Sequence, residues 1–102
     1  MFARVLRSQF RVNKVAEASK LFQESVVPQC RKQKGFKGAY FMTNAKTGEA
    51  VIMTLWESEE AMLANEESRF FQDQVAKFVC FYAKPPIREA YEIAAIAEMK
   101  KG

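Results

Sequence analysis

The stretch 51-VIMTLWESEEAM-62 decides the fold, because a strand and a helix meet within it. Its first half, VIMTLW, is apolar at both odd and even positions, which is typical of a strand covered on both faces. Its second half starts at Ser58, a good N-cap residue, and Glu59 and Glu60 place negative charge in the first turn of a helix. The only tryptophan, Trp56, lies at the junction. The stretch therefore predicts a doubly covered strand that leads directly into a helix.

The sequence on either side contains further strand patterns. Residues 2–11 and 36–44 precede the central strand, which we place at 49–57, and a last strand is predicted at 87–96. Gly48 lies between the second and third segments and can adopt the positive φ that a tight hairpin needs. Four strands are therefore expected, and the middle two form a hairpin.

Two segments between these strands have helical spacing. The first follows Asn13, a suitable N-cap, and Pro28 is expected to end or kink it. The second starts after Ser58, bends within 65–68 and continues through Tyr82 until two consecutive prolines stop it. Its later part carries an apolar stripe that consists of Phe71, Val75, Phe78 and Tyr82.

The element order β-α-β-β-α-β predicts a fold of the α+β class. With right-handed crossovers and one hairpin, this order gives a ferredoxin-like domain with a four-stranded antiparallel sheet, and it spans residues 1–102 as a single domain. Helices on one side would leave the other face of strand 49–57 uncovered. A second copy of the chain supplies the cover most simply, so we expect a homodimer whose two sheets form an α/β barrel with the helices outside.

Composition excludes several classes of function. The chain has no histidine, so Ser-His-Asp, Cys-His and histidine-metal chemistry are excluded, and Cys30 and Cys80 form no CxxC pair. We interpret both cysteines as buried apolar thiols rather than a redox pair. No Gly-rich phosphate loop is present, and the basic residues at 31–37 fit a helix end better than a nucleic-acid site. No apolar run approaches the roughly 18 residues of a membrane helix, and no signal peptide is evident, so a cytoplasmic protein is expected.

The motif LWESEEAM, preceded by KGFKGAYFM and a Thr-Gly hairpin, resembles the antibiotic biosynthesis monooxygenase family of dimeric α+β barrels. The resemblance covers roughly residues 2 to 93 and is most specific at residues 56–59. It implies a pocket between the sheet and the helices of each subunit, to which Trp56 would contribute. It also implies a cofactor-independent oxygenase that converts a phenolic or hydroquinone-like compound to a quinone.

This chain departs from the family's functional subgroups at several positions. The quinone-forming members have an Asn where this chain has Ile52, a Tyr at Met62, and an Arg near Ala76. The haem-degrading members have their iron-binding His at Val75 and a Trp at Asn65. The resemblance therefore implies no haem, no metal and no other cofactor, and it leaves the catalytic residues unassigned.

Seven side chains are candidates for the pocket. Arg4 shares a strand face with Leu6 and Ser8 and could stabilise a substrate oxyanion, while a tyrosine could donate or accept a proton. Aromatic residues would form a wall for a planar ring. The candidates are Arg4, Tyr40, Trp56, Asn65, Phe71, Phe78 and Tyr91.

Each candidate also has a structural interpretation. Arg4 can pair with Glu89 or Glu92, the phenylalanines can be ordinary core residues, and the tyrosines can be ordinary sheet residues. Three hypotheses follow. The chain is a cofactor-free monooxygenase acting on a small phenol or quinol; it is a non-catalytic ligand-binding or stress-associated dimer; or it is a structural dimer with a filled core.

Overall fold

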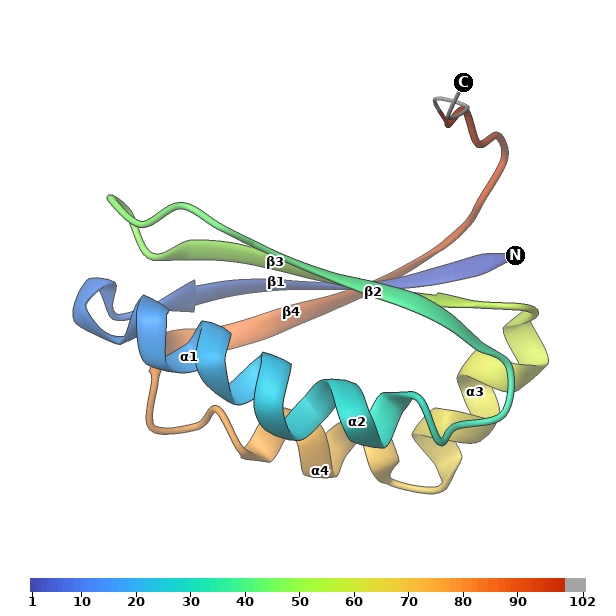
Figure 1. The fold of residues 1–102 in the computed structure, drawn as a ribbon, viewed down its shortest axis with the longest axis horizontal. Helices are drawn as coiled ribbons and strands as arrows, with labels where there is room; N and C mark the ends of the chain where they lie inside the picture. The colour runs from blue at the N-terminus through green and yellow to red at the C-terminus, as the bar shows by residue number, and fades with distance from the viewer. Residues whose placement is uncertain (99–102) are drawn as a thin grey trace.

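A computed structural model of the protein, in which residues 1–98 are described, contains one four-stranded antiparallel sheet. The strands are β1 (Phe2–Phe10), β2 (Phe36–Thr43), β3 (Glu49–Trp56) and β4 (Tyr82–Glu92). Their order in the sheet is β2-β3-β1-β4, so β1 and β3 are central and β4 is an edge strand. Figure 1 shows all the labelled helices on one side of this sheet. The arrangement is the expected α+β ferredoxin-like fold.

The first helical region is divided where the sequence contains a proline. It consists of η1 (Val12–Lys14), α1 (Val15–Leu21), the π-helical turn η2 (Phe22–Val26) and α2 (Val27–Cys30). Pro28 lies in the first turn of α2 and has no N–H to donate to the preceding turn, which explains why the regular ladder is interrupted there. The expected N-cap role of Asn13 is wrong, since this residue lies within η1 and no side chain caps η1 or α1.

The second helical region agrees with its predicted start and break. Ser58 caps α3 (Glu59–Glu67), and its Oγ accepts a hydrogen bond of 3.1 Å from the backbone N–H of Ala61. Arg69 then adopts a left-handed φ of 67° and separates α3 from α4 (Phe70–Ala76). A non-glycine residue seldom takes this conformation, so the backbone direction changes sharply at this point.

The predicted end of the second helix is wrong. The helix ends at Ala76, and Tyr82 begins β4, which contains Pro85 and Pro86 and extends to Glu92. Proline cannot donate to a strand ladder, but an edge strand has one side free of hydrogen bonds and tolerates it. The pairing of β4 with β1 also shifts register between Arg7 and Gln9. The prolines therefore lie inside a strand instead of ending a helix.

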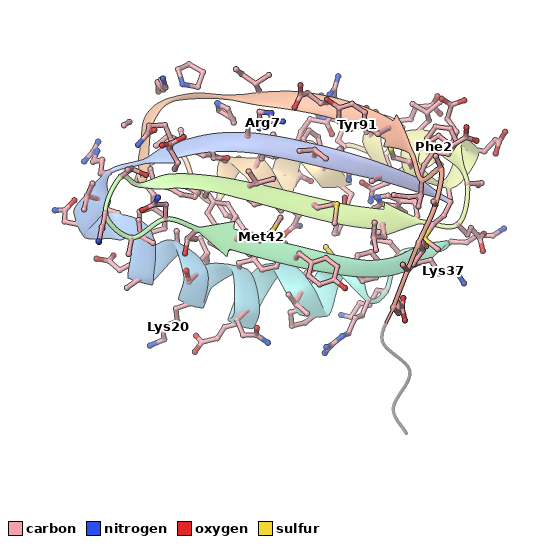
Figure 2. All side chains as sticks on the ribbon, turned by 90° about the horizontal axis from the view of Figure 1, so that it is seen from above. Phe2, Arg7, Lys20, Lys37, Met42 and Tyr91 are labelled. Atoms are coloured by element: carbon pink, nitrogen blue, oxygen red, sulfur yellow. The ribbon has the colours of Figure 1, made fainter. Side chains whose placement is uncertain are left out.

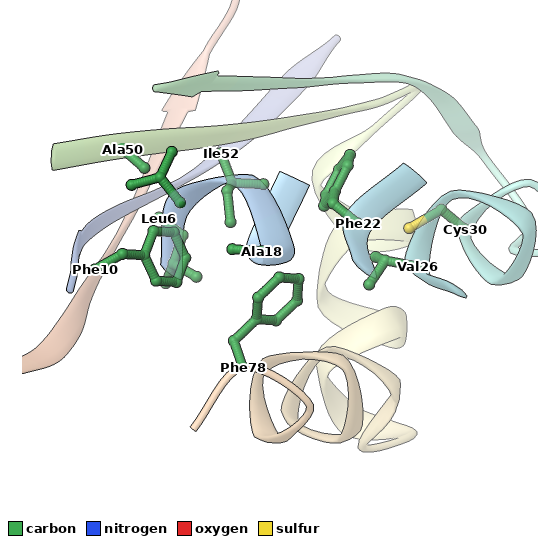
Figure 3. Close-up of a cluster of buried hydrophobic side chains, with 10 residues drawn as sticks. Leu6, Phe10, Ala18, Phe22, Val26, Cys30, Ala50, Ile52 and Phe78 are labelled. Carbon is green, nitrogen blue, oxygen red and sulfur yellow. The ribbon is translucent and has the colours of Figure 1, made fainter. Parts of the chain in front are cut away.

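Alternate residues of the central strands face the helices and form the core. Ile52 pairs with Leu6 across β1 and β3, and Ala50 pairs with Ser8 on the same face. Phe78, which follows α4, points toward Ala18 of α1 and toward the sheet (Figure 3). The buried cluster consists of Leu6, Phe10, Val15, Ala18, Phe22, Val26, Cys30, Ala50, Ile52 and Phe78.

The opposite face of the sheet has no helix over it. Val51, Met53 and Leu55 of β3 are only partly buried, so within one chain the central strand is fully covered on one face alone. Figure 2 looks onto this open face, where Arg7, Met42 and Tyr91 project from three different strands. We call this surface the open face. The second sheet that we expected over it remains a prediction about a partner chain.

Gly48 sets the hairpin between β2 and β3. Its φ is 80°, and a side chain there would come within 2.2 Å of the carbonyl oxygen of Phe10. The hairpin therefore packs directly against the end of β1, and only glycine fits. Within the described part of the chain, no helix has the length and apolar character needed to cross a membrane.

Candidate functional site

A cavity of about 50 Å³ lies between the helix-facing side of the sheet and the helices. Most of its lining is apolar, and its polar side chains are Arg4, Cys30, Thr54 and Gln74. By volume the cavity holds roughly three to five water molecules, which is comparable to one small ring. The apolar part of the wall consists of Leu6, Phe22, Val26, Ile52, Phe70, Phe71, Val75 and Phe78.

Arg4 supplies the only charged side chain among the residues that line this cavity. Its side chain is 4% exposed, and it faces the helices because it pairs with Thr54 of β3. Nη2 donates a hydrogen bond of 2.7 Å to Oδ1 of Asn65, and Nη1 donates one of 3.3 Å to Oε2 of Glu66. The expectation that Arg4 pairs with Glu89 or Glu92 is wrong, because α3 packs against β1 and places Glu66 beside Arg4.

Glu66 is shared between two arginines. Its Oε1 lies 3.1 Å from Nη1 of Arg88, while its Oε2 is bound by Arg4. Burial lowers the pKa of Arg4, and the hydrogen bond and charge of Glu66 oppose that shift. Since arginine has a very high intrinsic pKa, the guanidinium stays charged. The cluster therefore has two positive charges and one negative charge beside the cavity.

Aromatic rings enclose the guanidinium of Arg4. Its Cζ lies 4.2 Å from the ring centre of Phe71 and 5.4 Å from that of Trp56, both within cation–π range. Cζ of Arg88 lies 5.5 Å from the ring centre of Phe71. Phe71 thus contacts both arginines and the cavity, and its position depends on the charge cluster as well as on apolar packing.

Trp56 is completely buried and does not line the cavity; it packs against residues that do. Its side chain is 0% exposed, and Nε1 donates a hydrogen bond of 3.0 Å to Oγ1 of Thr54. The indole also packs edge-on against Phe36, with 5.7 Å between ring centres. Because Thr54 and Arg4 do line the cavity, Trp56 fixes two of its polar residues without contacting its interior.

The structure divides the seven predicted pocket residues into three groups. Arg4, Phe71 and Phe78 line the cavity. Trp56 and Asn65 contact Arg4 from outside it. The two tyrosines, Tyr40 and Tyr91, are 55% and 49% exposed and lie on the open face, where they pair with Met53 and Ala3. These tyrosines therefore do not belong to the pocket between the sheet and the helices.

Sequence reasoning missed several lining residues. Thr54 has the strand parity of Trp56, and this parity places it on the same face of the strand as Trp56. Cys30 follows Phe22 and Val26 at four-residue helical steps, and Gln74 follows Phe71 by one turn, so helical spacing could have identified both. The expectation that both cysteines are buried is right for Cys30 and wrong for Cys80, which is exposed.

The lining groups can bind and orient, but few of them can move a proton. Burial raises the pKa of the Cys30 thiol, and the charges of Arg4 and Lys77 only partly offset this. The thiol is therefore protonated at neutral pH and is a poor base or nucleophile. Among residues 1–98, no group of three or more His, Cys, Asp or Glu side chains is arranged to hold a metal. The arrangement suits an uncharged or anionic ring held beside Arg4.

Comparisons with known proteins place this architecture in a family. The sequence profile of the antibiotic biosynthesis monooxygenases matches residues 1–77 of the 102. No curated protein matches the chain.

Several solved structures share its fold. A Nitrosomonas europaea protein named as an antibiotic biosynthesis monooxygenase has 14% identity and a TM-score of 0.74, over 93% of this chain and 100% of its own. A Bordetella bronchiseptica protein of the same name has 14% identity and a TM-score of 0.77, over 92% and 97%. The monooxygenase from the gene ActVA-Orf6 of Streptomyces coelicolor, solved with Nanaomycin D, has 18% identity and a TM-score of 0.76, over 96% and 92%. These structural similarities show the fold. Because the family's sequence profile matches residues 1–77, the chain belongs to the antibiotic biosynthesis monooxygenase family.

Proposed function

We propose that the protein is a homodimeric, cofactor-independent monooxygenase that oxidises a small phenolic or quinol-type compound in the cavity between the sheet and the helices. The observation that carries the proposal is the buried guanidinium of Arg4, which lies in the wall of an apolar cavity beside the ring of Phe71. A fixed cation in a desolvated site stabilises a developing oxyanion more strongly than water does.

Arg4 would favour the phenolate form of the substrate. Its hydrogen bonds to Asn65 and Glu66 hold the guanidinium in place, and its remaining N–H donors are available to a phenolate oxygen. A phenolate is electron-rich enough to transfer an electron to dioxygen. With a hydrogen at the para carbon, a phenol and one dioxygen give one quinone and one water, so one oxygen atom enters the ring. A hydroquinone has no such hydrogen, and oxygen would enter at an ortho carbon to give one hydroxyquinone and one water.

The apolar wall would protect this reaction from bulk water. Phe71 and Phe78 provide flat surfaces for a single ring, and Ile52 closes the sheet side. A cavity of about 50 Å³ favours one ring over a fused ring system. The substrate class that fits best is therefore a monocyclic phenol or hydroquinone.

Isotope incorporation tests the proposal. The purified protein is incubated with a panel of monocyclic phenols under isotopically heavy dioxygen, and the quinone is reduced at once to prevent exchange with water. We expect one heavy oxygen atom per product and turnover above the rate of autoxidation. The variant Arg4→Met should fall to the autoxidation rate. The variant Arg11→Met, which changes an exposed arginine just after β1, should retain full activity. Turnover no faster than autoxidation for every phenol would remove the catalytic part of the proposal.

The open face supports the homodimer. Val51, Met53 and Leu55 form an apolar strip on β3, and Tyr40 and Met42 of β2 lie beside it. A second sheet over this strip would bury it as a barrel interior. Light scattering should give twice the mass of one chain for the wild type and a single-chain mass for Met53→Glu. A wild-type monomer at high concentration would contradict the dimer.

We also propose a cytoplasmic location, because Cys30 and Cys80 form no disulfide and free thiols are stable in a reducing compartment.

The second candidate function is ligand binding without catalysis. Arg4 is already partly neutralised by Glu66, and no lining residue is an effective base at neutral pH, since the pKa of Cys30 is raised. Binding of monocyclic phenols without product under heavy dioxygen would support this function instead.

A further inference from the structure

Gln74 lies in the cavity wall and carries an unpaired acceptor. It lies on α4, one helical turn after Phe71, and it lines the cavity. Its Oε1 is buried and has no hydrogen-bond partner among the described residues. We propose that Gln74 accepts a hydrogen bond from the cavity's ligand and thereby sets its specificity for compounds that carry a hydroxyl away from Arg4.

The free-energy cost of burying a carbonyl oxygen without a donor favours this role for Gln74. Burying an acceptor without a donor is unfavourable, so a ligand that supplies an O–H gains a hydrogen bond and relieves the desolvation cost. A ligand of the same shape with a methyl group at that position leaves Oε1 unpaired. Sites that depend on such a bond discriminate strongly against the analogue that lacks it.

Arg4 and Gln74 have opposite hydrogen-bonding character on different walls. Arg4 comes from β1 in the sheet and only donates, while Oε1 of Gln74 comes from α4 and only accepts. A ring that satisfies both has an oxyanion at one position and a hydroxyl at another. The monoanion of a dihydroxybenzene has this pattern. The inference rests on the proposed function only in taking the cavity as the ligand site.

Gln72 provides a matched control. It lies two residues from Gln74 on the same helix, and its Oε1 is also buried without a partner. However, Gln72 does not line the cavity. Replacing either glutamine by methionine removes one unpaired oxygen with little change of volume, but only the change at position 74 alters the ligand's surroundings.

Calorimetric titration under argon tests the proposal, because dioxygen is absent and binding is measured without turnover. Hydroquinone and para-cresol are titrated into the wild type, Gln74→Met and Gln72→Met. The wild type should bind hydroquinone about tenfold more tightly than para-cresol. Gln74→Met should lose or reverse this preference, and Gln72→Met should keep it.

The possible failures are distinguishable. Equal binding of the two compounds by the wild type overturns the role of Gln74 without any variant, and so does an unchanged preference in Gln74→Met. Both results leave the cavity as a ligand site. If neither compound binds the wild type, the role of Gln74 and the proposed function both fail. Thermal unfolding of each variant confirms that it is folded, and Gln74→Leu replaces Gln74→Met if the latter is not.

Discussion

Arg4 and Arg7 lie three residues apart on β1, and each pairs with a glutamate, but on opposite faces of the sheet. Arg4 is 4% exposed and lies 3.3 Å from Glu66, whereas Arg7 is 59% exposed and lies 2.6 Å from Glu89. The shorter ion pair is therefore the more exposed one. Water screens an exposed pair, so distance alone does not measure its contribution to stability. Burial decides which arginine matters to the fold and the site.

The same contrast appears in the pKa values of the two pairs. Burial lowers the pKa of Arg4, while the hydrogen bond to Glu89 raises that of Arg7. The hydrogen bond from Arg7 in turn lowers the pKa of Glu89. On the helix-facing side, desolvation has the largest effect on the arginine pKa. On the open face, the hydrogen bond to Glu89 and its charge have the largest effect. A site for an anionic ring needs the first kind of environment, because there the cation is poorly hydrated.

The largest expected difference between the faces concerns two adjacent residues of β3. Ile52 faces the core, and Val51 faces the open side. Ile52→Ala should lower the free energy of unfolding by about 3 kcal/mol, because it removes buried apolar contacts and enlarges the cavity that Ile52 lines. Val51→Ala should cost less than about 1 kcal/mol in dilute protein. Urea unfolding of both variants measures the difference.

Protein concentration sharpens this test. If the open face is a dimer interface, the loss caused by Val51→Ala should grow as concentration rises, while that of Ile52→Ala should hardly change. Equal losses of unfolding free energy in the two variants at all concentrations would show that the two faces are equally well packed. This result would contradict the proposed difference between the faces.

A smaller effect is expected from matched changes of the two arginines. Arg4→Met should reduce stability by about 2 kcal/mol, because Asn65 and Glu66 lose a charged donor in a buried place. Glu66 keeps Arg88, which limits the loss. Arg7→Met should leave the urea midpoint at neutral pH unchanged within error. Similar midpoints for both variants would mean that burial does not distinguish these pairs.

The sheet could be predicted because its signals are local. The apolar run at β3, the glycine hairpin and the capped start of α3 each depend on residues close together in the chain, and all three are confirmed. The end of α4 was missed because Phe78 and Tyr82 keep helical spacing after the helix has ended. Both are packed against the core, Phe78 from a turn and Tyr82 from an edge strand, so apolar spacing could not separate them.

The site was only partly predictable because it joins distant segments. Strand parity places Thr54 and Trp56 on one face of β3, and the register of β1 and β3, which the structure supplies, adds Arg4 to that face. No local signal pairs Arg4 with Glu66, since that contact joins β1 to α3 and its two residues are 62 positions apart in the chain. The tyrosines were misplaced because the pattern of β3 is apolar on both faces and leaves open which face receives the helices.

The smallest effect expected at neutral pH concerns Tyr82, whose hydroxyl is on the buried side. Its ring stacks on Phe10 with 5.1 Å between ring centres, and its hydroxyl is buried without a partner among the described residues. Burial raises its pKa from 10.0 to about 12. The unfolded chain therefore releases this proton at a lower pH than the folded protein does.

The free energy of unfolding should consequently fall as pH rises from 10 toward about 12. Below pH 10 the hydroxyl is neutral in both the folded and the unfolded chain, so none of this stability is lost there. Tyr82→Phe removes this group, so its unfolding midpoint should decline less steeply over that range than the wild type does. The hydroxyl of Ser8 opposes the rise in the pKa of Tyr82, but the two hydroxyls are not within hydrogen-bond geometry, so Tyr82→Phe should change stability little at neutral pH. Cys30→Ala gives an independent comparison, because the pKa of Cys30 is also raised, from 9.0, and its effect starts one unit lower. If the unfolding midpoints of the wild type and Tyr82→Phe decline in parallel with pH, the Tyr82 hydroxyl is hydrated in the folded protein. This end of the helix-facing side would then be no drier than the open face.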